Sequence, residues 1–304
     1  MLKDLHDLPK LRDSLSYLYV EHCRVEQSDF AIELIDQDGR VPVPVAALGV
    51  LMLGPGTTIT HAAVRALAEN GCSILWCGEH NVRFYAQGMG ETRKSYRLLK
   101  QADLYIDDEK RREVAWRMFE LRFGYRIEED VSLNQLRGME GVRMREAYAE
   151  ASEFYGVPWR GRRYNRNNWQ KADPINRALS AANACMYGIC HAAIVSGGYS
   201  PALGFIHTGK MLSFVYDIAD LYKTEITIPL AFLITKESPK EVEDRVRLAC
   251  RDVFRKERLL KRLLPDIDAL LDLPSKVREG EEPIDEDPAM PTRLWEALWE
   301  ELEG

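Results

Sequence analysis

Cysteine is scarce and scattered in this chain. Six cysteines occur among 304 residues, and no two of them form a C-x-x-C pair. A disulfide framework is typical of short secreted chains, and zinc ligands usually occur at characteristic short spacings. We therefore predict reduced thiols, neither a disulfide framework nor a structural zinc site, and a cytoplasmic protein.

Long uncharged apolar runs are also absent. No such run approaches the roughly 20 residues that a membrane-spanning helix needs. Lys3, Asp4 and Asp7 interrupt the N-terminal region, so we expect no signal peptide there. The chain is 46% apolar and 29% charged, which is typical of a soluble globular protein.

The sequence lacks the excess of basic charge that marks many nucleic-acid-binding proteins. It has 41 basic and 48 acidic residues. The imbalance comes from residues 279–304, which hold ten acidic residues and one basic residue, Arg293. Residues 1–278 hold 40 basic and 38 acidic residues. The body of the chain is therefore nearly neutral, and local basic patches remain possible.

Three regions differ in their residue pattern. Residues 1–87 contain short extended segments bounded by turn residues, which predict a β domain with one helix. Residues 88–278 contain long helical patterns and predict an all-α domain. Residues 279–304 are acidic and contain prolines, which predicts a flexible tail ending in a short amphipathic segment. Together they predict an α+β fold, with a β domain followed by an α-helical one.

Turn residues and helix caps predict the individual elements. A capping box of Ser132 with Gln135 starts one helix, and Asp173 followed by Pro174 starts another. In the β region we expect an extended segment over 14–25, a helix after Thr60, and hairpins pairing 30–35 with 41–45 and 73–77 with 82–86. Apolar periodicity predicts helices over 94–105, 109–122, 132–155, 174–196, 213–223 and 239–261.

Glu140 is the first candidate for catalysis. It lies within a predicted helix, between Gly138 and Gly141. A glycine inside a helix costs about 1 kcal/mol relative to alanine. Two glycines beside one carboxylate therefore suggest that another backbone, or a ligand, approaches closely at this point.

A second segment places a histidine close to two carboxylates. His207 lies in a loop flanked by glycines, and Asp217 and Asp220 are three residues apart on the next helix, facing the same side. One histidine with several carboxylates suits Mg²⁺ or Mn²⁺, and phosphodiester chemistry needs such an ion. Alternatively, the two aspartates form ion pairs with Lys210 and Lys223. The spacing alone leaves both interpretations open.

These two segments resemble the signature blocks of the CRISPR-associated integrase family, the larger subunit of the spacer-acquisition complex, and its subtype I-E members most. Further matching blocks occur in the same order at 53–57, 61–65, 118–124, 161–164 and 246–252. The resemblance implies an N-terminal β-sandwich-like domain and an α-helical catalytic domain. It also implies that Glu140, His207 and Asp220 hold the metal, with Asp217 beside them as a support or alternative catalytic ligand.

The same resemblance implies an activity and an assembly. Family members join the 3′-OH ends of short prespacer DNA to the CRISPR repeat by metal-assisted transesterification. The lack of a nucleophilic Ser or Cys motif fits that reaction. The implied partners are double-stranded DNA with 3′ single-stranded ends, CRISPR repeat DNA, a second copy of the chain, and a small ferredoxin-like protein whose dimer is flanked by two dimers of this chain. The alternatives are a stand-alone metal-dependent endonuclease acting on branched DNA and a non-catalytic DNA-binding scaffold.

Several residues match positions that lie near DNA in the family. Tyr164 matches a position that helps to read the protospacer-adjacent motif, and it follows two arginines that can bind phosphate. His22 stands where the best-known subtype member has a tyrosine that stacks on the DNA fork. The other predicted DNA contacts are Arg83, Arg137, Arg162, Arg163, Tyr187 and Lys210.

Three further features each have two interpretations. A polar stripe on the 174–196 helix either contacts DNA or forms hydrogen bonds inside the core. A basic stripe in the 239–261 helix either follows a phosphate backbone or is a solvated face. The amphipathic end of the tail docks on a partner or packs back on its own chain. The polar stripe comprises Asn176, Ser180, Asn183 and Tyr187, and the basic stripe comprises Arg247, Arg251 and Arg255.

Overall fold

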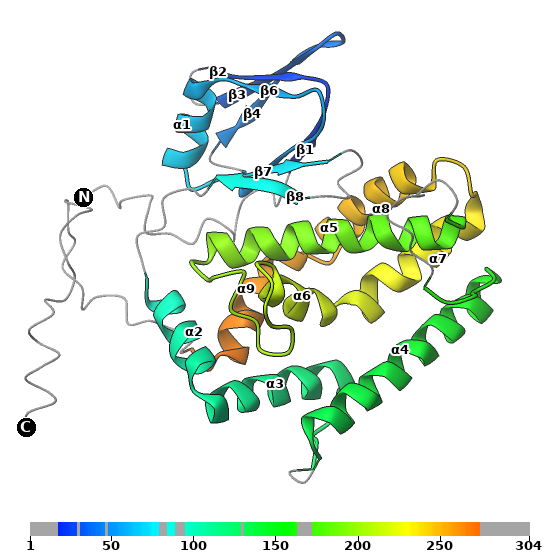
Figure 1. Ribbon diagram of the computed structural model, residues 1–304. Coiled ribbons are helices and arrows are strands. Elements are labelled where there is room, and N and C mark those ends of the chain that lie inside the picture. The colour runs from blue at the N-terminus through cyan, green and yellow to red at the C-terminus, as the bar shows by residue number, and fades with distance from the viewer. Residues whose placement is uncertain are drawn as a thin grey trace, which may run out of the picture.

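The computed structural model describes residues 18–28, 31–45, 48–78, 84–88, 95–128, 131–162 and 172–273. Figure 1 shows strands and one helix stacked above a larger group of helices. The predicted α+β fold is therefore confirmed. The predicted domain limits stay a prediction, and the acidic tail over 279–304 lies outside the described residues.

Two four-stranded sheets make up the β part of the described chain. The first has the order β4-β3-β2-β6 and the second β1-β5-β7-β8. Apolar side chains from both sheets pack together beneath helix α1 (His61–Glu69), among them Val25, Ile32 and Leu51. The strands are β1 (Leu18–Val20), β2 (Arg24–Ser28), β3 (Ala31–Asp36), β4 (Gly39–Pro44), β5 (Val50–Leu53), β6 (Thr58–Ile59), β7 (Ser73–Cys77) and β8 (Phe84–Gly88).

Both predicted hairpins are confirmed, because β3 pairs antiparallel with β4 and β7 with β8. The single extended segment predicted over 14–25 is wrong in its described part. β1 and β2 belong to different sheets, and the chain turns between them at His22, whose φ is +52°. The amide of His22 donates to the carbonyl of Pro55 at 3.0 Å, which fixes this turn.

Eight helices follow in the described helical part. They are α2 (Tyr96–Ile106), α3 (Asp108–Phe123), α4 (Leu133–Tyr155), α5 (Pro174–Ser196), α6 (Ser213–Asp220), α7 (Ile228–Glu237), α8 (Val242–Lys256) and α9 (Leu259–Leu270). The first four agree with the predicted helices, and the Ser132 capping box and the Asp173 cap are both present.

Two helix predictions need correction. The helix predicted over 213–223 ends at Asp220 and is followed by a π-helical segment, Lys223–Thr227, and by α7, which was not predicted. The helix predicted over 239–261 is instead two helices, α8 and α9. The chain breaks between them at Arg258, whose φ is +48°.

Helix α5 lies at the centre of the helical part (Figure 1). Its stretch Pro174–Val195 is long and apolar enough to cross a membrane, but 72% of its most apolar window is buried inside the protein. α5 also contacts the β part, because Ala192 packs in a small apolar cluster with Val50, Met52, Leu75 and Cys77. α5 is therefore a core helix that joins the two parts of the fold.

His191 on α5 makes stability depend on pH. The side chain is buried, and burial lowers the pKa of His191 from 6.5 to about 4. Below pH 6.5 His191 is protonated in the unfolded chain but stays neutral in the folded chain until the pH nears 4. The free energy of unfolding therefore decreases as the pH falls from 6.5 through 4. We expect about 3 kcal/mol of the free energy of unfolding to be lost over this window.

Urea unfolding of the wild type and of His191→Leu at pH 7.5 and pH 4.5 measures this contribution. The variant should lose less stability than the wild type between the two pH values. Equal losses would show that His191 contributes nothing to the pH dependence.

Candidate functional site

Asp217 on α6 holds the loop that precedes its helix. Its carboxylate is fully buried and accepts the backbone amides of Phe205 at 2.6 Å, Ile206 at 3.1 Å and His207 at 2.9 Å. Gly204 allows this tight loop, since a Cβ there would lie 2.3 Å from the carbonyl oxygen of His207. The Asp217 carboxylate is thus occupied by the protein itself.

Asp217 also fixes the ring of His207, whose Nδ1 lies 2.7 Å from the carboxylate. A carboxylate beside Nδ1 favours the tautomer with its proton on that nitrogen, which leaves the lone pair on Nε2. His207 Nε2 lies 3.9 Å from Oδ2 of Asp220, and the side chain is 44% exposed. The ring therefore has one nitrogen held by the protein and one open to a ligand.

Glu140 and Asp220 meet around a buried arginine. The Arg122 guanidinium on α3 contacts the Glu140 carboxylate on α4. Its other terminal nitrogen donates to the backbone carbonyl of Asp217 at 3.1 Å and lies 3.8 Å from Oδ2 of Asp220. The consecutive helices α3 and α4 thus meet α6, which lies much later in the sequence, at this point.

Lys223 is a second cation at the site. It contacts Asp220 and donates to the hydroxyl of Tyr187 at 2.7 Å. Burial acts to lower the pKa of Lys223, but the negative charge of Asp220 and the contact with Tyr187 outweigh it and raise the pKa above its usual range. The side chain is therefore charged, and the alternative prediction of an Asp220–Lys223 ion pair is confirmed.

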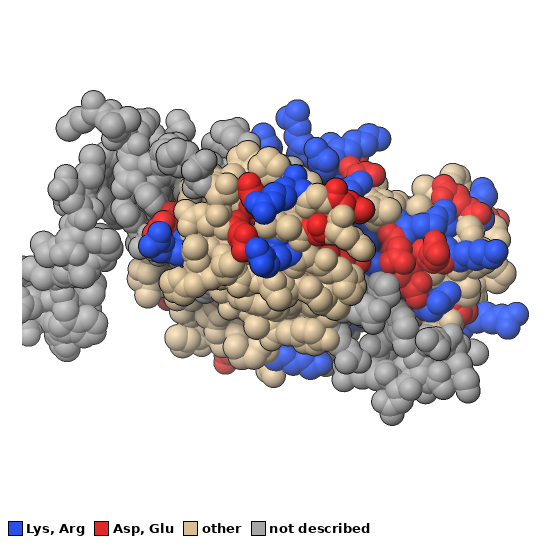
Figure 2. All heavy atoms as spheres, turned by 90° about the horizontal axis from the view of Figure 1, so that it is seen from above, with Lys and Arg blue, Asp and Glu red and all other residues tan. Residues whose placement is uncertain are grey.

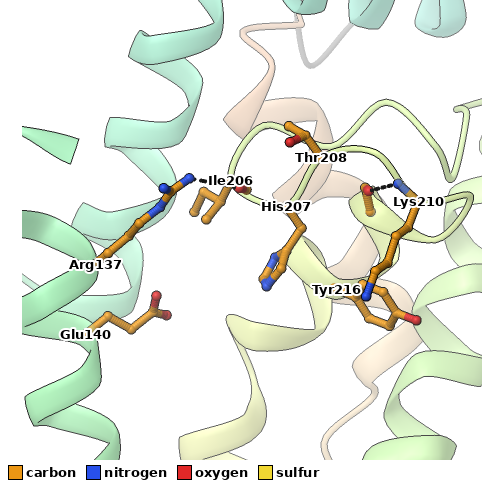
Figure 3. A pocket seen from close by; sticks show the side chains of 8 residues that line it. Arg137, Glu140, Ile206, His207, Thr208, Lys210 and Tyr216 are labelled. Carbon is orange, nitrogen blue, oxygen red and sulfur yellow. Dashed lines mark hydrogen bonds between the residues drawn. The ribbon is translucent and has the colours of Figure 1, made fainter. Parts of the chain in front are cut away.

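A cleft of about 430 Å³ opens beside these groups. It is lined by Arg137 and Glu140 from α4, by the 206–210 loop including His207 and Lys210, and by Ser213 and Tyr216 from α6. Figure 3 shows the Glu140 carboxylate and the His207 ring entering the same space from different elements. Arg137 and Lys210 add positive charge, so the cleft suits an anionic ligand.

The described residues contain no group of three or more His, Cys, Asp or Glu side chains already arranged to hold a metal ion. Arg122 contacts the Glu140 carboxylate and Lys223 contacts the Asp220 carboxylate. The donor chemistry nevertheless fits Mg²⁺ or Mn²⁺: Glu140 and His207 line the cleft, and the partly exposed Asp220 carboxylate lies 3.9 Å from Nε2 of His207. A metal ion would have to compete with the two cations.

The expected close approach of another backbone at Glu140 is wrong within the described part of the chain. A Cβ added at Gly138 would meet no atom within 4 Å, and one at Gly141 would meet only Nη1 of Arg145 at 3.8 Å. The two glycines leave open space beside Glu140, so only the ligand interpretation remains as a prediction.

The predicted DNA contacts differ in their surroundings. Arg137 and Lys210 line the cleft, and His22 is exposed in its turn. Tyr187 points into the site, where it contacts Lys223 and the ring of Tyr216. Arg83, Arg163 and Tyr164 lie outside the described residues.

Two predicted DNA-binding arginines make contacts within the protein. The Arg162 guanidinium donates to the carbonyl of Asn176 at 3.1 Å and to the hydroxyl of Ser180 at 2.9 Å. The Arg247 side chain is only 13% exposed and pairs with Asp244. The prediction of a continuous exposed basic stripe is therefore wrong at Arg247, while Arg251 is exposed and pairs with Asp252.

The polar stripe on α5 forms internal hydrogen bonds. Asn176 and Ser180 are buried and contact Arg162, and the amide oxygen of Asn183 accepts from the hydroxyl of Thr227 at 3.1 Å. Charge is mixed on the face seen from above: Figure 2 shows small groups of both signs separated by uncharged areas. The cleft is thus the better-defined candidate for anion binding.

Two residues at the site, Arg122 and Tyr216, were not predicted from the sequence. Arg122 had one usable signal, because it follows Met118 and Phe119 at spacings of four and three and so lies on the apolar face of its helix. Tyr216 had none, since an aromatic residue beside Val215 is expected in any core helix. Its ring packs edge-on against His207, with centroids 5.9 Å apart.

The family described as CRISPR associated protein Cas1 matches residues 17–123 and 121–245 of this chain. The chain belongs to the Cas1 family. A curated member from Thermus thermophilus, named CRISPR-associated endonuclease Cas1 2, is 54% identical over 99% of this chain and 92% of its own. Another from Escherichia coli, named CRISPR-associated endonuclease Cas1, is 46% identical over 88% of both chains.

A solved Cas1 structure supports the same assignment. The crystal structure of a TtCas1-DNA complex is 56% identical to this chain, matches 87% of this chain and 99% of its own, and superimposes with a TM-score of 0.68. The Cas1 fold therefore extends over nearly all of that protein and most of this one.

Proposed function

We propose that this Cas1 family member is a metal-dependent DNA integrase of CRISPR adaptation. It joins the 3′-OH ends of short prespacer DNA to the CRISPR repeat. The observation that carries the proposal is the Asp217–His207 pair: a buried carboxylate fixes one ring nitrogen and leaves the other 3.9 Å from the Asp220 carboxylate. Metal-ligating histidines are typically oriented in this way.

Glu140, His207 and Asp220 would hold Mg²⁺ or Mn²⁺. When bound, such an ion neutralises phosphate oxygens and stabilises the leaving oxygen. The chain's own residues orient the strands: Arg137 and Lys210 bind phosphates at the cleft, and Asp217 keeps the His207 loop in place. Arg83, Arg163, Tyr164, Tyr187 and His22 are further proposed DNA contacts.

The proposed reaction exchanges one phosphodiester for another. The 3′-oxygen of the prespacer attacks a phosphorus atom of the repeat, the old bond from that phosphorus to a 3′-oxygen breaks, and the proton of the incoming hydroxyl ends on the outgoing one. No bond energy is lost, so no energy source and no covalent enzyme intermediate are needed.

The proposed partners are the prespacer duplex with 3′ single-stranded ends, the CRISPR repeat, a second copy of this chain, and the small ferredoxin-like adaptation protein. DNA binding in general is supported by the related TtCas1 structure, which is a DNA complex. The protein partners rest on family membership.

The deciding experiment compares two prespacer duplexes that differ by one oxygen atom at each 3′ end. One ends in 3′-OH and the other in 3′-deoxy, and each is mixed with the wild type, the small partner, Mn²⁺ and a supercoiled plasmid bearing the repeat. We expect joined product only with the 3′-OH duplex, because the 3′-oxygen is the nucleophile, and none after chelation of the metal.

A matched reaction with a branched duplex separates the alternatives. If the branched duplex is cleaved at the same rate whether its strands end in 3′-OH or 3′-deoxy, and no joined product forms, the protein is a stand-alone endonuclease. Binding of both duplexes without any change in the DNA would support a scaffold. Either result would overturn the integrase proposal.

A further inference from the structure

Arg122 is a charged side chain with no exposure to solvent. It lies in the last turn of α3, and its guanidinium packs over the ring of Phe119 at 5.5 Å. Its Nε has no hydrogen-bond partner among the described residues. A buried guanidinium is costly unless nearby groups compensate its charge, so its partners account for its presence.

Those partners are the groups of the candidate metal site. Arg122 contacts Glu140, donates to the carbonyl of Asp217 at 3.1 Å, and lies 3.8 Å from Asp220. One side chain thus connects α3 with α4 and α6. The carboxylates that would bind a divalent cation are already compensated by a cation that belongs to the protein.

We propose that Arg122 is the internal counter-cation and positioning residue of the metal site. It holds Glu140 and the Asp217 carbonyl at a fixed separation when no metal is bound, and it prevents the carboxylates from repelling one another. A divalent ion then enters by sharing these carboxylates with Arg122. This inference rests on the proposed function, because it assigns Arg122 a role toward the metal that Glu140 and Asp220 would bind.

Two consequences separate this role from that of an ordinary buried ion pair. Without Arg122 the Glu140 carboxylate is uncompensated and Asp220 keeps only Lys223, so a divalent ion should bind the two carboxylates more tightly. At the same time Glu140 loses its anchor, so DNA joining should slow although the metal is bound. A purely structural pair would lower stability without strengthening metal binding.

The test measures Mn²⁺ binding by calorimetry and thermal unfolding of the protein without DNA. For Arg122→Met we expect Tm without metal to fall by roughly 10 °C and the Kd for Mn²⁺ to fall about tenfold or more. Arg122→Lys keeps the charge and should retain a Kd near that of the wild type, with an intermediate Tm.

Arg97→Met is the matched control. Arg97 forms a partly buried pair with Asp268, at 2.8 Å, outside the cleft. This variant should lose stability, with its Kd for Mn²⁺ unchanged. An unchanged or weaker Kd in Arg122→Met would overturn the counter-cation role.

A double variant keeps the proposal testable if Arg122→Met does not fold. Adding Glu140→Gln removes one uncompensated charge, so the double variant should fold and regain much of the lost Tm. If it remains as unstable as Arg122→Met, the inference fails. The comparison of Tm between Arg122→Met and the double variant needs no metal. Failure of the proposed metal site would be seen separately, as Mn²⁺ binding that is unchanged in Glu140→Gln, His207→Ala and Asp220→Asn.

Discussion

Alanine substitution of Glu140, His207 or Asp220 is expected to lower the rate of DNA joining by about a thousandfold or more. Each substitution removes one of the three proposed metal ligands, and the bound ion is expected to supply several kcal/mol of transition-state stabilisation. DNA affinity should change little, because Arg137 and Lys210 remain at the cleft. The measurements are single-turnover joining rates and fluorescence anisotropy with labelled duplex.

Stability should separate these three variants. His207 is 44% exposed, so His207→Ala should unfold close to the wild type. Glu140→Ala removes the main carboxylate partner of Arg122, and Asp220→Ala removes the carboxylate partner of Lys223. Both variants should therefore be less stable than the wild type. Glu140→Gln and Asp220→Asn are therefore the better tests of chemistry, since they keep the shape and a hydrogen-bond acceptor.

Asp103→Ala is the control for a carboxylate removed elsewhere. Asp103 on α2 is exposed and pairs with Lys110 at 2.9 Å. The rate of DNA joining should not change in this variant. If the three ligand variants join DNA as fast as Asp103→Ala, the assignment of the metal site is wrong.

Asp217→Ala is expected to damage both the loop and the reaction. The substitution leaves the amides of Phe205, Ile206 and His207 without their acceptor. Loss of these bonds should cost about 3–5 kcal/mol of the free energy of unfolding. Because the His207 ring also loses its support, joining or metal affinity should fall about 10–100-fold.

Hydrogen exchange at the three amides measures the loop directly, and urea unfolding measures the stability. Asp173→Ala provides the comparison, because Asp173 accepts one amide, that of Asn176, at the start of α5. It should lose about 1 kcal/mol and keep its activity. Full protection of the three loop amides in Asp217→Ala would contradict the role assigned to Asp217.

Local signals in the sequence predicted most helices correctly, and their failures have physical reasons. Caps at Ser132 and Asp173 are set by residues within one turn, so α4 and α5 could be predicted. α7 is buried on several sides and thus lacks an amphipathic pattern. The break between α8 and α9 occurs at Arg258 in a left-handed conformation, where no glycine or proline marks it.

The site was predictable in its components but not in its arrangement. Family resemblance identified Glu140, His207 and Asp220, and the spacing placed Asp217 beside Asp220. Spacing could not reveal that Asp217 turns toward its own loop and is fully buried, while the Asp220 carboxylate is partly exposed and lies near Nε2 of His207. Arg122 is 95 residues from Asp217 in the sequence, so only the packing of α3 against α4 and α6 shows their connection.

Helix α5 has a mechanical consequence for any assembly built on this chain. Ala192 is embedded in the face of the β part, and Tyr187, five residues earlier on the same helix, reaches the Lys223 side of the site. The two positions are about 7.5 Å apart along a continuous helix. Because this helix is continuous and short between the two positions, it holds them at a fixed distance. A partner protein bound to the β part and a DNA strand bound at the site would therefore keep a fixed relative orientation.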